Sequence, residues 1–147
     1  MGMALHGIIT GTSPGSAITA ALGSALHGLD VYDAIQIACE VQGATGGTLD
    51  LYVQASWDNG TTWWDWAHLA QLSAAAAAVK YMINAPGMGA AAITAVGKGT
   101  TPALAVATVI GGVGSWGRSI RVLSVAGAST SAGAVQTFTV HGLRLTH

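Results

Sequence analysis

The chain of 147 residues is long enough for one domain with a single buried core, and its charge is unusually sparse. Only 7% of the residues are Asp, Glu, Lys or Arg, against about 25% in ordinary soluble domains. The net charge of −1 excludes a basic surface for nucleic acid. So sparse a charge predicts a surface that neighbouring subunits of an oligomer or lattice largely cover.

The sequence predicts no membrane-spanning segment, and its first residues predict no helix or strand. The longest apolar stretches, such as Ala103–Ile110, fall far short of the roughly 20 residues that a spanning helix needs, so we expect no membrane partner. Residues 1–15, which end in Ser13-Pro14-Gly15, predict a flexible N-terminal arm. Residues 16–147 show no linker and predict a single domain.

Alternation of apolar with polar residues predicts the first strands. Val31–Gln42 and Thr48–Trp57 both alternate in the way that is typical of half-buried strands. Asp58-Asn59-Gly60 follows, and its Asn-Gly pair favours the positive φ angles of a hairpin turn. Thr62–Leu69 then returns as the partner strand, so Leu49–Leu69 is expected to form a hairpin.

The second half of the chain is less regular. In Ser73–Met82 five consecutive alanines favour a helix, whereas the rhythm of the neighbouring segments favours a strand; we expect a strand. Asn84–Thr101, rich in Gly and Ala, predicts a long loop. Further strands are expected at Leu104–Ile110, Ser119–Ala126 and Val135–Thr146. In the last of these the apolar phase changes at His141-Gly142, which predicts a β-bulge.

Short strands with Gly-rich connections predict an all-β fold, namely an antiparallel β-sandwich. With about seven or eight strands in one small domain, we expect a jelly roll. Cys39 is the only cysteine, so no intramolecular disulfide can form. Its apolar strand context predicts a small buried side chain rather than a reactive thiol.

One turn motif is complete. The fixed positions of the Asp-box pattern, Ser-x-Asp-x-Gly-x-Thr-Trp, are filled by Ser56, Asp58, Gly60, Thr62 and Trp63. Asp and Ser side chains readily bond to turn amides, and Gly permits the sharp reversal. The motif occurs several times in sialidases and other glycan-active propellers but once here, so we interpret it as a structural turn.

The strand after the turn carries candidates for a protein–protein interface: Trp64, Trp66 and His68. If Trp63 faces inward, alternation places these three side chains on the opposite face. Trp is enriched in interface hot spots. Two alternatives stay open: both faces are buried, one of them under the Asn84–Thr101 loop, or the exposed Trp rings stack on sugars.

No pattern predicts an enzyme or a cofactor. The five His residues lack the paired spacing of metal ligands, and no Cys or carboxylate accompanies them at that spacing. The sequence contains no nucleophile elbow, and its Gly-rich stretches lack the Lys of a phosphate loop. We therefore expect a non-enzymatic protein without a metal or other cofactor.

The stretch Thr48–Leu69, TLDLYVQASWDNGTTWWDWAHL, resembles a hairpin that recurs in small virion proteins of tailed bacteriophages. There it reads approximately LDVYVQxSxDGGTTW followed by DxAHF, and Asn59 and Leu69 are conservative departures from that pattern. The match covers 22 of the 147 residues. The remaining chain, rich in Ala and Gly, resembles a capsid cement (decoration) protein of the jelly-roll type.

The resemblance implies a structural protein on the capsid exterior that clamps neighbouring subunits of the major capsid protein. It further implies a homo-dimer or homo-trimer within the lattice, assembly in the host cytoplasm, and an arm at residues 1–15 that orders on binding. A neck, tail or head-fibre component is the alternative within the virion. A carbohydrate-binding module that uses Trp64 and Trp66 is the alternative outside it.

Overall fold

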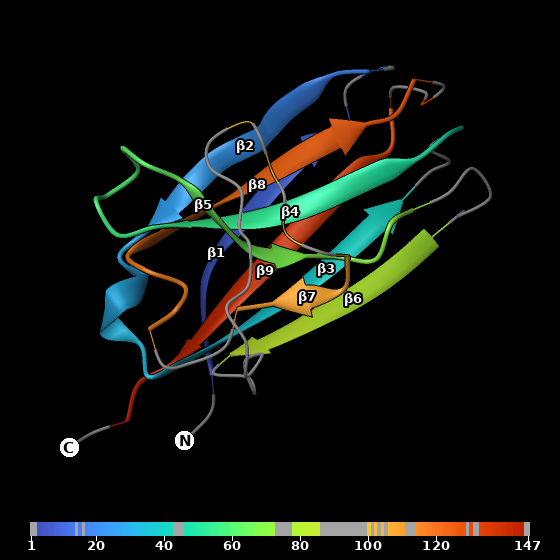
Figure 1. Ribbon diagram of the computed structural model, residues 1–147. Helices are drawn as coiled ribbons and strands as arrows, with labels where there is room; N and C mark the ends of the chain where they lie inside the picture. The colour runs from blue at the N-terminus through green and yellow to red at the C-terminus, as the bar shows by residue number, and fades with distance from the viewer. Residues whose placement is uncertain are drawn as a thin grey trace.

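The computed structural model describes residues 3–13, 15, 17–42, 46–72, 78–85, 100, 102, 104, 106–110, 114–128, 130 and 133–145. These residues form two antiparallel sheets packed face to face (Figure 1). The described elements are β1 (Ala4–Thr12), β2 (Thr19–His27), a 3-10 turn η1 (Leu29–Val31), β3 (Ala34–Gln42), β4 (Leu49–Ser56), β5 (Trp64–His68), β6 (Ala78–Ala85), β7 (Thr108–Val109), β8 (Ser119–Ala126) and β9 (Val135–Leu143).

The four-stranded sheet has the order β1-β9-β3-β6, and the five-stranded sheet has the order β2-β8-β4-β5-β7. Most connections cross from one sheet to the other, and this interleaving is the strand order of a jelly roll. The expected all-β antiparallel sandwich is therefore confirmed. Within the described part of the chain, no helix has the length and hydropathy needed to cross a membrane.

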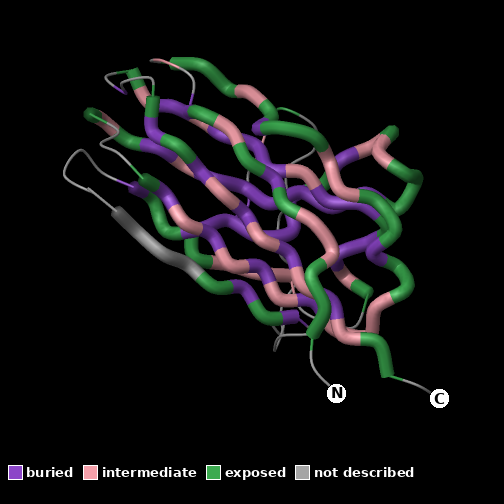
Figure 2. The backbone as a smooth tube through the Cα atoms, turned by 180° about the vertical axis from the view of Figure 1, so that it is seen from behind, coloured by how far each residue is buried: buried purple, intermediate pink, exposed green. Residues whose placement is uncertain are grey.

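The core lies between the inner faces of the two sheets. Along β3 every second residue from Ile35 to Val41 is buried, while the residues between them are half-buried (Figure 2). Leu49, Leu51 and Val53 of β4 supply the facing side chains. Removing this apolar surface from water supplies the main stabilisation of the fold.

The first 15 residues do not form an arm, so that expectation is wrong. β1 pairs with β9 from Ala4 opposite Gly142 to Thr12 opposite Val135, and it is an edge strand of the four-stranded sheet. Its apolar alternation is weak because Gly replaces larger residues where β1 approaches β2. A Cβ atom at Gly7, for example, would lie 2.7 Å from the side chain of Leu26. β2 was not predicted for the same reason.

The β-bulge predicted at His141-Gly142 is also wrong, because β9 pairs with β3 without a register shift. The shift occurs in β1, between Leu5 and Gly7. Gly142 keeps the inward phase of the strand, and the ring of Tyr32 occupies the space where its side chain would be. The apparent change of phase thus marks a glycine in the core face.

The later segments agree with the sequence in part. β6 confirms a strand for residues 78–82, whereas residues 73–77 lie outside the described residues. Asn84 belongs to this strand rather than to the predicted loop, of which residues 86–99 are likewise outside the described residues. Among the described residues of Leu104–Ile110, which exclude residue 105, Thr108 and Val109 form a strand.

Candidate functional site

The hairpin turn between β4 and β5 is built by side-chain hydrogen bonds. The Ser56 hydroxyl donates to Asp58 Oδ1 at 2.7 Å, and the same carboxylate oxygen accepts from the Thr62 backbone N–H at 2.7 Å. Gly60 donates its N–H to Ser56 Oγ at 2.8 Å, with Asn59 and Gly60 at φ angles of 58° and 93°. Every polar contact of these side chains serves the reversal of the chain.

The Thr62 N–H, followed by the Ser56 hydroxyl, lowers the pKa of Asp58 to about 2. Both groups donate hydrogen bonds to the charged carboxylate and so favour it over the protonated acid. Asp58 is therefore an ionised acceptor that holds the turn.

Trp64, Trp66 and His68 do not share one face of β5, because a β-bulge interrupts the strand. The register passes from Val53 opposite Ala67 to Gln54 opposite Asp65, which leaves Trp66 as the extra residue. Trp66 is 1% exposed in the core, where its Nε1 donates to Ser115 Oγ at 3.0 Å. Trp66 is therefore unavailable to a partner or a sugar ring.

The bulge also changes the surroundings of Trp63, which was expected to face the core. Trp63 is buried, but it lies outside the main core cluster. The Arg121 guanidinium lies 4.9 Å from the centre of its ring, a cation–π contact on the outer side of the sheet.

A polar network crosses the outer face of the five-stranded sheet. Arg121 Nε donates to Gln54 Oε1 at 2.8 Å, and Gln54 Nε2 donates to Asp65 Oδ1 at 2.9 Å. The backbone N–H of Leu104 donates to Asp65 Oδ2 at 3.1 Å. Gln54 and Asp65 are buried, so these bonds supply the partners that buried polar groups require.

His68 joins the same network from the end of β5. Its Nδ1 lies 2.8 Å from Leu104 O, and its Nε2 lies 2.9 Å from Asp50 Oδ1. The ring stacks on Tyr52 with centroids 3.9 Å apart. Both ring nitrogens are thus engaged within the fold, and this Asp–His pair holds Leu104 in place.

Leu104 covers this part of the outer face. With Tyr52 and Leu123 it forms a second, smaller apolar cluster outside the main core. His68 is accordingly 4% exposed. The structure thus covers the outer face at His68 with Leu104, whereas the Asn84–Thr101 loop that was expected as the cover lies, apart from residues 84, 85 and 100, outside the described residues.

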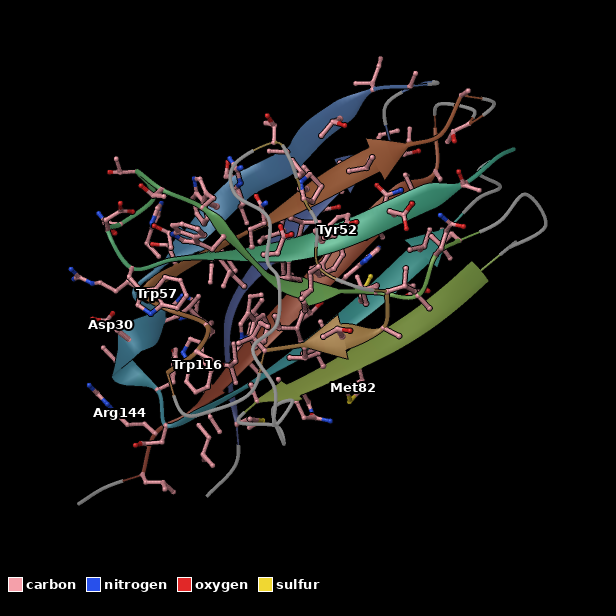
Figure 3. The ribbon with its side chains drawn as sticks, in the orientation of Figure 1. Asp30, Tyr52, Trp57, Met82, Trp116 and Arg144 are labelled. Atoms are coloured by element: carbon pink, nitrogen blue, oxygen red, sulfur yellow. The ribbon has the colours of Figure 1, made fainter. Side chains whose placement is uncertain are left out.

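Two tryptophans remain open at the hairpin end of the sandwich. Trp57 is 52% exposed and Trp64 is 36% exposed, and both line a hollow of about 180 Å³. Figure 3 shows Trp57 at this end of the sandwich. The sequence pattern placed Trp57 in phase with the core residues of β4. Because β4 ends at Ser56, Trp57 lies beyond the sheet, and its position beside the Asp58 turn was the signal for exposure.

The hydroxyl group of Ser115 in this hollow is used by the fold itself. Ser115 Oγ accepts from Trp66 and donates to Ile110 O at 3.0 Å. The proton of this hydroxyl is therefore not available to a guest in the hollow.

The outer face of the four-stranded sheet is the other open surface. One row across it consists of Ile8, Thr139, Ala38 and Met82, paired in register on β1, β9, β3 and β6. Ile8 and Met82 are 51% and 60% exposed. In the neighbouring row Thr137 and Glu40 follow, and the remaining described side chains on this face are Leu5, Thr10, Thr12, Ala34, Gln36, Gln42, Asn84, Val135, His141 and Leu143.

Glu40 and His141 are ionisable residues of this face, and Lys80 pairs with Glu40 in the register of β6 and β3. No group of three or more His, Cys, Asp or Glu within the described ranges could hold a metal ion.

Comparison of the chain with protein-family models, with curated proteins and with solved structures found no match.

Proposed function

We propose that this chain is a structural virion protein of the capsid cement type, which binds the outside of a phage head and bridges major capsid subunits. The outer face of the four-stranded sheet is the docking surface, and the observation that carries the proposal is its exposed apolar side chains. Ile8 and Met82, exposed at 51% and 60%, stand in one row with Thr139 and Ala38. A free monomer rarely presents large apolar side chains on a face with so few charged residues.

The fold agrees with such a role without proving it. Jelly rolls are common in viral capsid proteins and also in lectins, and a fold alone does not assign a function. A clamp acts through many repeated contacts, and the multivalency of a lattice makes interfaces of modest affinity effectively permanent. Trp57 and Trp64 offer a second anchor at one end of the same molecule.

The proposal is tested by placing positive charge on the docking face. The double variant Ile8→Lys/Thr139→Lys adds two charges to adjacent positions on β1 and β9, outside the core. The variant should stay folded and lose co-sedimentation with capsid particles by at least about 100-fold, because two charges would be buried without partners.

The matched control is Thr19→Lys/Ala21→Lys, which adds the same charge to exposed positions of β2. It should co-sediment with capsids as the wild type does. Equal binding by both double variants would remove the four-stranded sheet as the docking face. A wild-type chain that never binds shells would remove the cement role and favour another virion site, such as the neck, tail or head fibre.

A further inference from the structure

The two long sides of the sandwich are closed to different extents. On one side β1 and β2 approach closely at glycines: a Cβ atom on Gly23 would lie 2.5 Å from Thr10 O. On the other side, β6 and β7 bound a cleft of about 200 Å³. Figure 1 shows these two strands next to each other, at the edges of their two sheets. The sandwich is thus sealed along one side and open along the other.

β6 is an edge strand with one partner among the described strands, β3, to which it pairs over all eight residues. In an antiparallel strand every second residue turns its N–H and C=O away from its partner. Those groups of β6 make no hydrogen bond to another described residue. Such a row of backbone donors and acceptors is a template for a further strand.

The cleft beside this edge is lined mainly by apolar groups. Ala67, Leu69 and Ile83 form its inner wall, and Ala107 and Val109 form the wall on the β7 side. Met82 lines the cleft and is also part of the outer face of the four-stranded sheet, and Figure 3 shows it on β6. The cleft is therefore continuous with the face proposed above as the docking surface.

We propose that this open side receives an extended, apolar segment of a neighbouring polypeptide, which adds as a strand to β6 and places alternate side chains in the cleft. Strand addition obtains affinity from the main chain and selectivity from pockets for every second side chain. The β6 edge provides the main-chain groups, and the cleft provides the pockets. The inference rests on the proposed function in one respect, since the neighbour would be a shell subunit.

The shape of the site favours a strand over other occupants. Among the described residues the outer edge of β6 has no partner over eight residues, and it fits a partner with regularly spaced backbone groups, which a small molecule or a helix does not offer. In the described part of the chain, the strand of the other sheet beside the cleft is β7, which has two residues. Only an extended segment satisfies the edge and fills the cleft together.

The test uses the free protein and a defined probe. The probe is an acetylated, amidated octapeptide of alternating valine and threonine between lysine ends. Hydrogen exchange of the β6 amides is followed by NMR as the peptide is added. Alternate amides of β6 should exchange at least about tenfold more slowly at saturation, because strand addition protects them. The control peptide has every second amide N-methylated and cannot pair.

Variants identify the cleft as the site. Met82→Lys and Ala107→Lys place a charge at exposed positions of the cleft wall and should abolish the protection, whereas Thr19→Lys on β2 should retain it. Unchanged exchange at the highest soluble peptide concentration, or equal slowing by the N-methylated peptide, would overturn the inference.

The two proposals fail separately. If the chain binds shells while its β6 amides exchange at the rate of the free protein, the strand addition is wrong and the cement role stands. If the probe peptide protects β6 but the chain binds no shell, the strand addition stands and the cement role is wrong.

Discussion

Cys39 illustrates how completely the inner face is sealed. Its side chain is 2% exposed among core residues of β3. Burial, and to a lesser degree the charge of Glu40, raises the pKa of the thiol to about 12. A thiol reacts as the thiolate, so at neutral pH Cys39 lacks both access and the reactive form.

We predict that a thiol reagent such as DTNB leaves the native chain unmodified at pH 8 over hours. In denaturant the same chain should react with one equivalent within minutes, because Cys39 is the only cysteine. Rapid modification of the native protein would show that the core opens readily along β3.

Asp58 gives a pH-dependent prediction. Its pKa in the fold is about 2, below the ordinary value of 3.8. A lowered carboxyl pKa contributes stability that is present above the ordinary value and is lost as pH falls through about 4 toward 2. Asp58→Asn should therefore unfold at a lower temperature than the wild type at pH 6. The difference should shrink steadily between about pH 4 and pH 2 in thermal scans. A difference independent of pH would contradict the assigned hydrogen bonds.

At the scale of elements, the β4–β5 hairpin carries the most information. The turn could be predicted from sequence because Asn-Gly and the Asp-box side chains act locally. The bulge at Trp66 could not, because it depends on space in the core and on the bond to Ser115, which are tertiary contacts. Trp66 entered the core with the bulge and His68 is covered by Leu104, so of the three predicted interface residues Trp64 alone stays exposed.

β1 and β2 show a second reason why part of the fold could not be predicted from the sequence. Alternation identifies strands whose inner residues are large, as in β3 and β4. Where two strands approach closely, glycine takes the inner positions and the pattern disappears, as at Gly7 and Gly11. The sequence therefore predicted the centre of both sheets and missed the sealed side of the sandwich.

The bulge predicts unequal effects of two tryptophan substitutions on the same hairpin. Trp66→Ala removes a fully buried ring and leaves a cavity, so it should lower the free energy of unfolding by about 3–5 kcal/mol. Trp57→Ala removes a half-exposed ring and should cost under about 1 kcal/mol. Urea denaturation of both variants measures the difference. Similar losses would mean that the bulge is placed wrongly.

At the scale of the whole molecule, the closed side of the sandwich depends on a glycine. Gly23 combines a φ of 56° with a close approach to β1, whereas Gly28 has a φ of 77° and nothing near its Cβ position. Gly28→Ala should cost about 1–2 kcal/mol through its backbone angle. Gly23→Ala should cost clearly more, because β1 must also move away from Thr10. Equal losses in denaturant titrations would contradict close packing of β1 on β2.

The sealed side, the cleft beside β6 and the exposed apolar side chains of the outer face are the features on which the proposed role among neighbouring subunits rests. The sparse charge of the chain fits this arrangement, since a covered surface needs few charges. The outer face of the five-stranded sheet, in contrast, is partly covered by the chain itself through Leu104 and His68. For this reason the proposed docking surface is the four-stranded sheet with its β6 edge.

The most direct test of the proposed role is sedimentation of the purified chain with capsid particles of tailed phages, with bound protein measured against concentration. We predict saturable binding at a fixed ratio to the major capsid protein, and a free chain that light scattering finds as a dimer or trimer. A monomer that stays in the supernatant at every concentration would contradict the central claim.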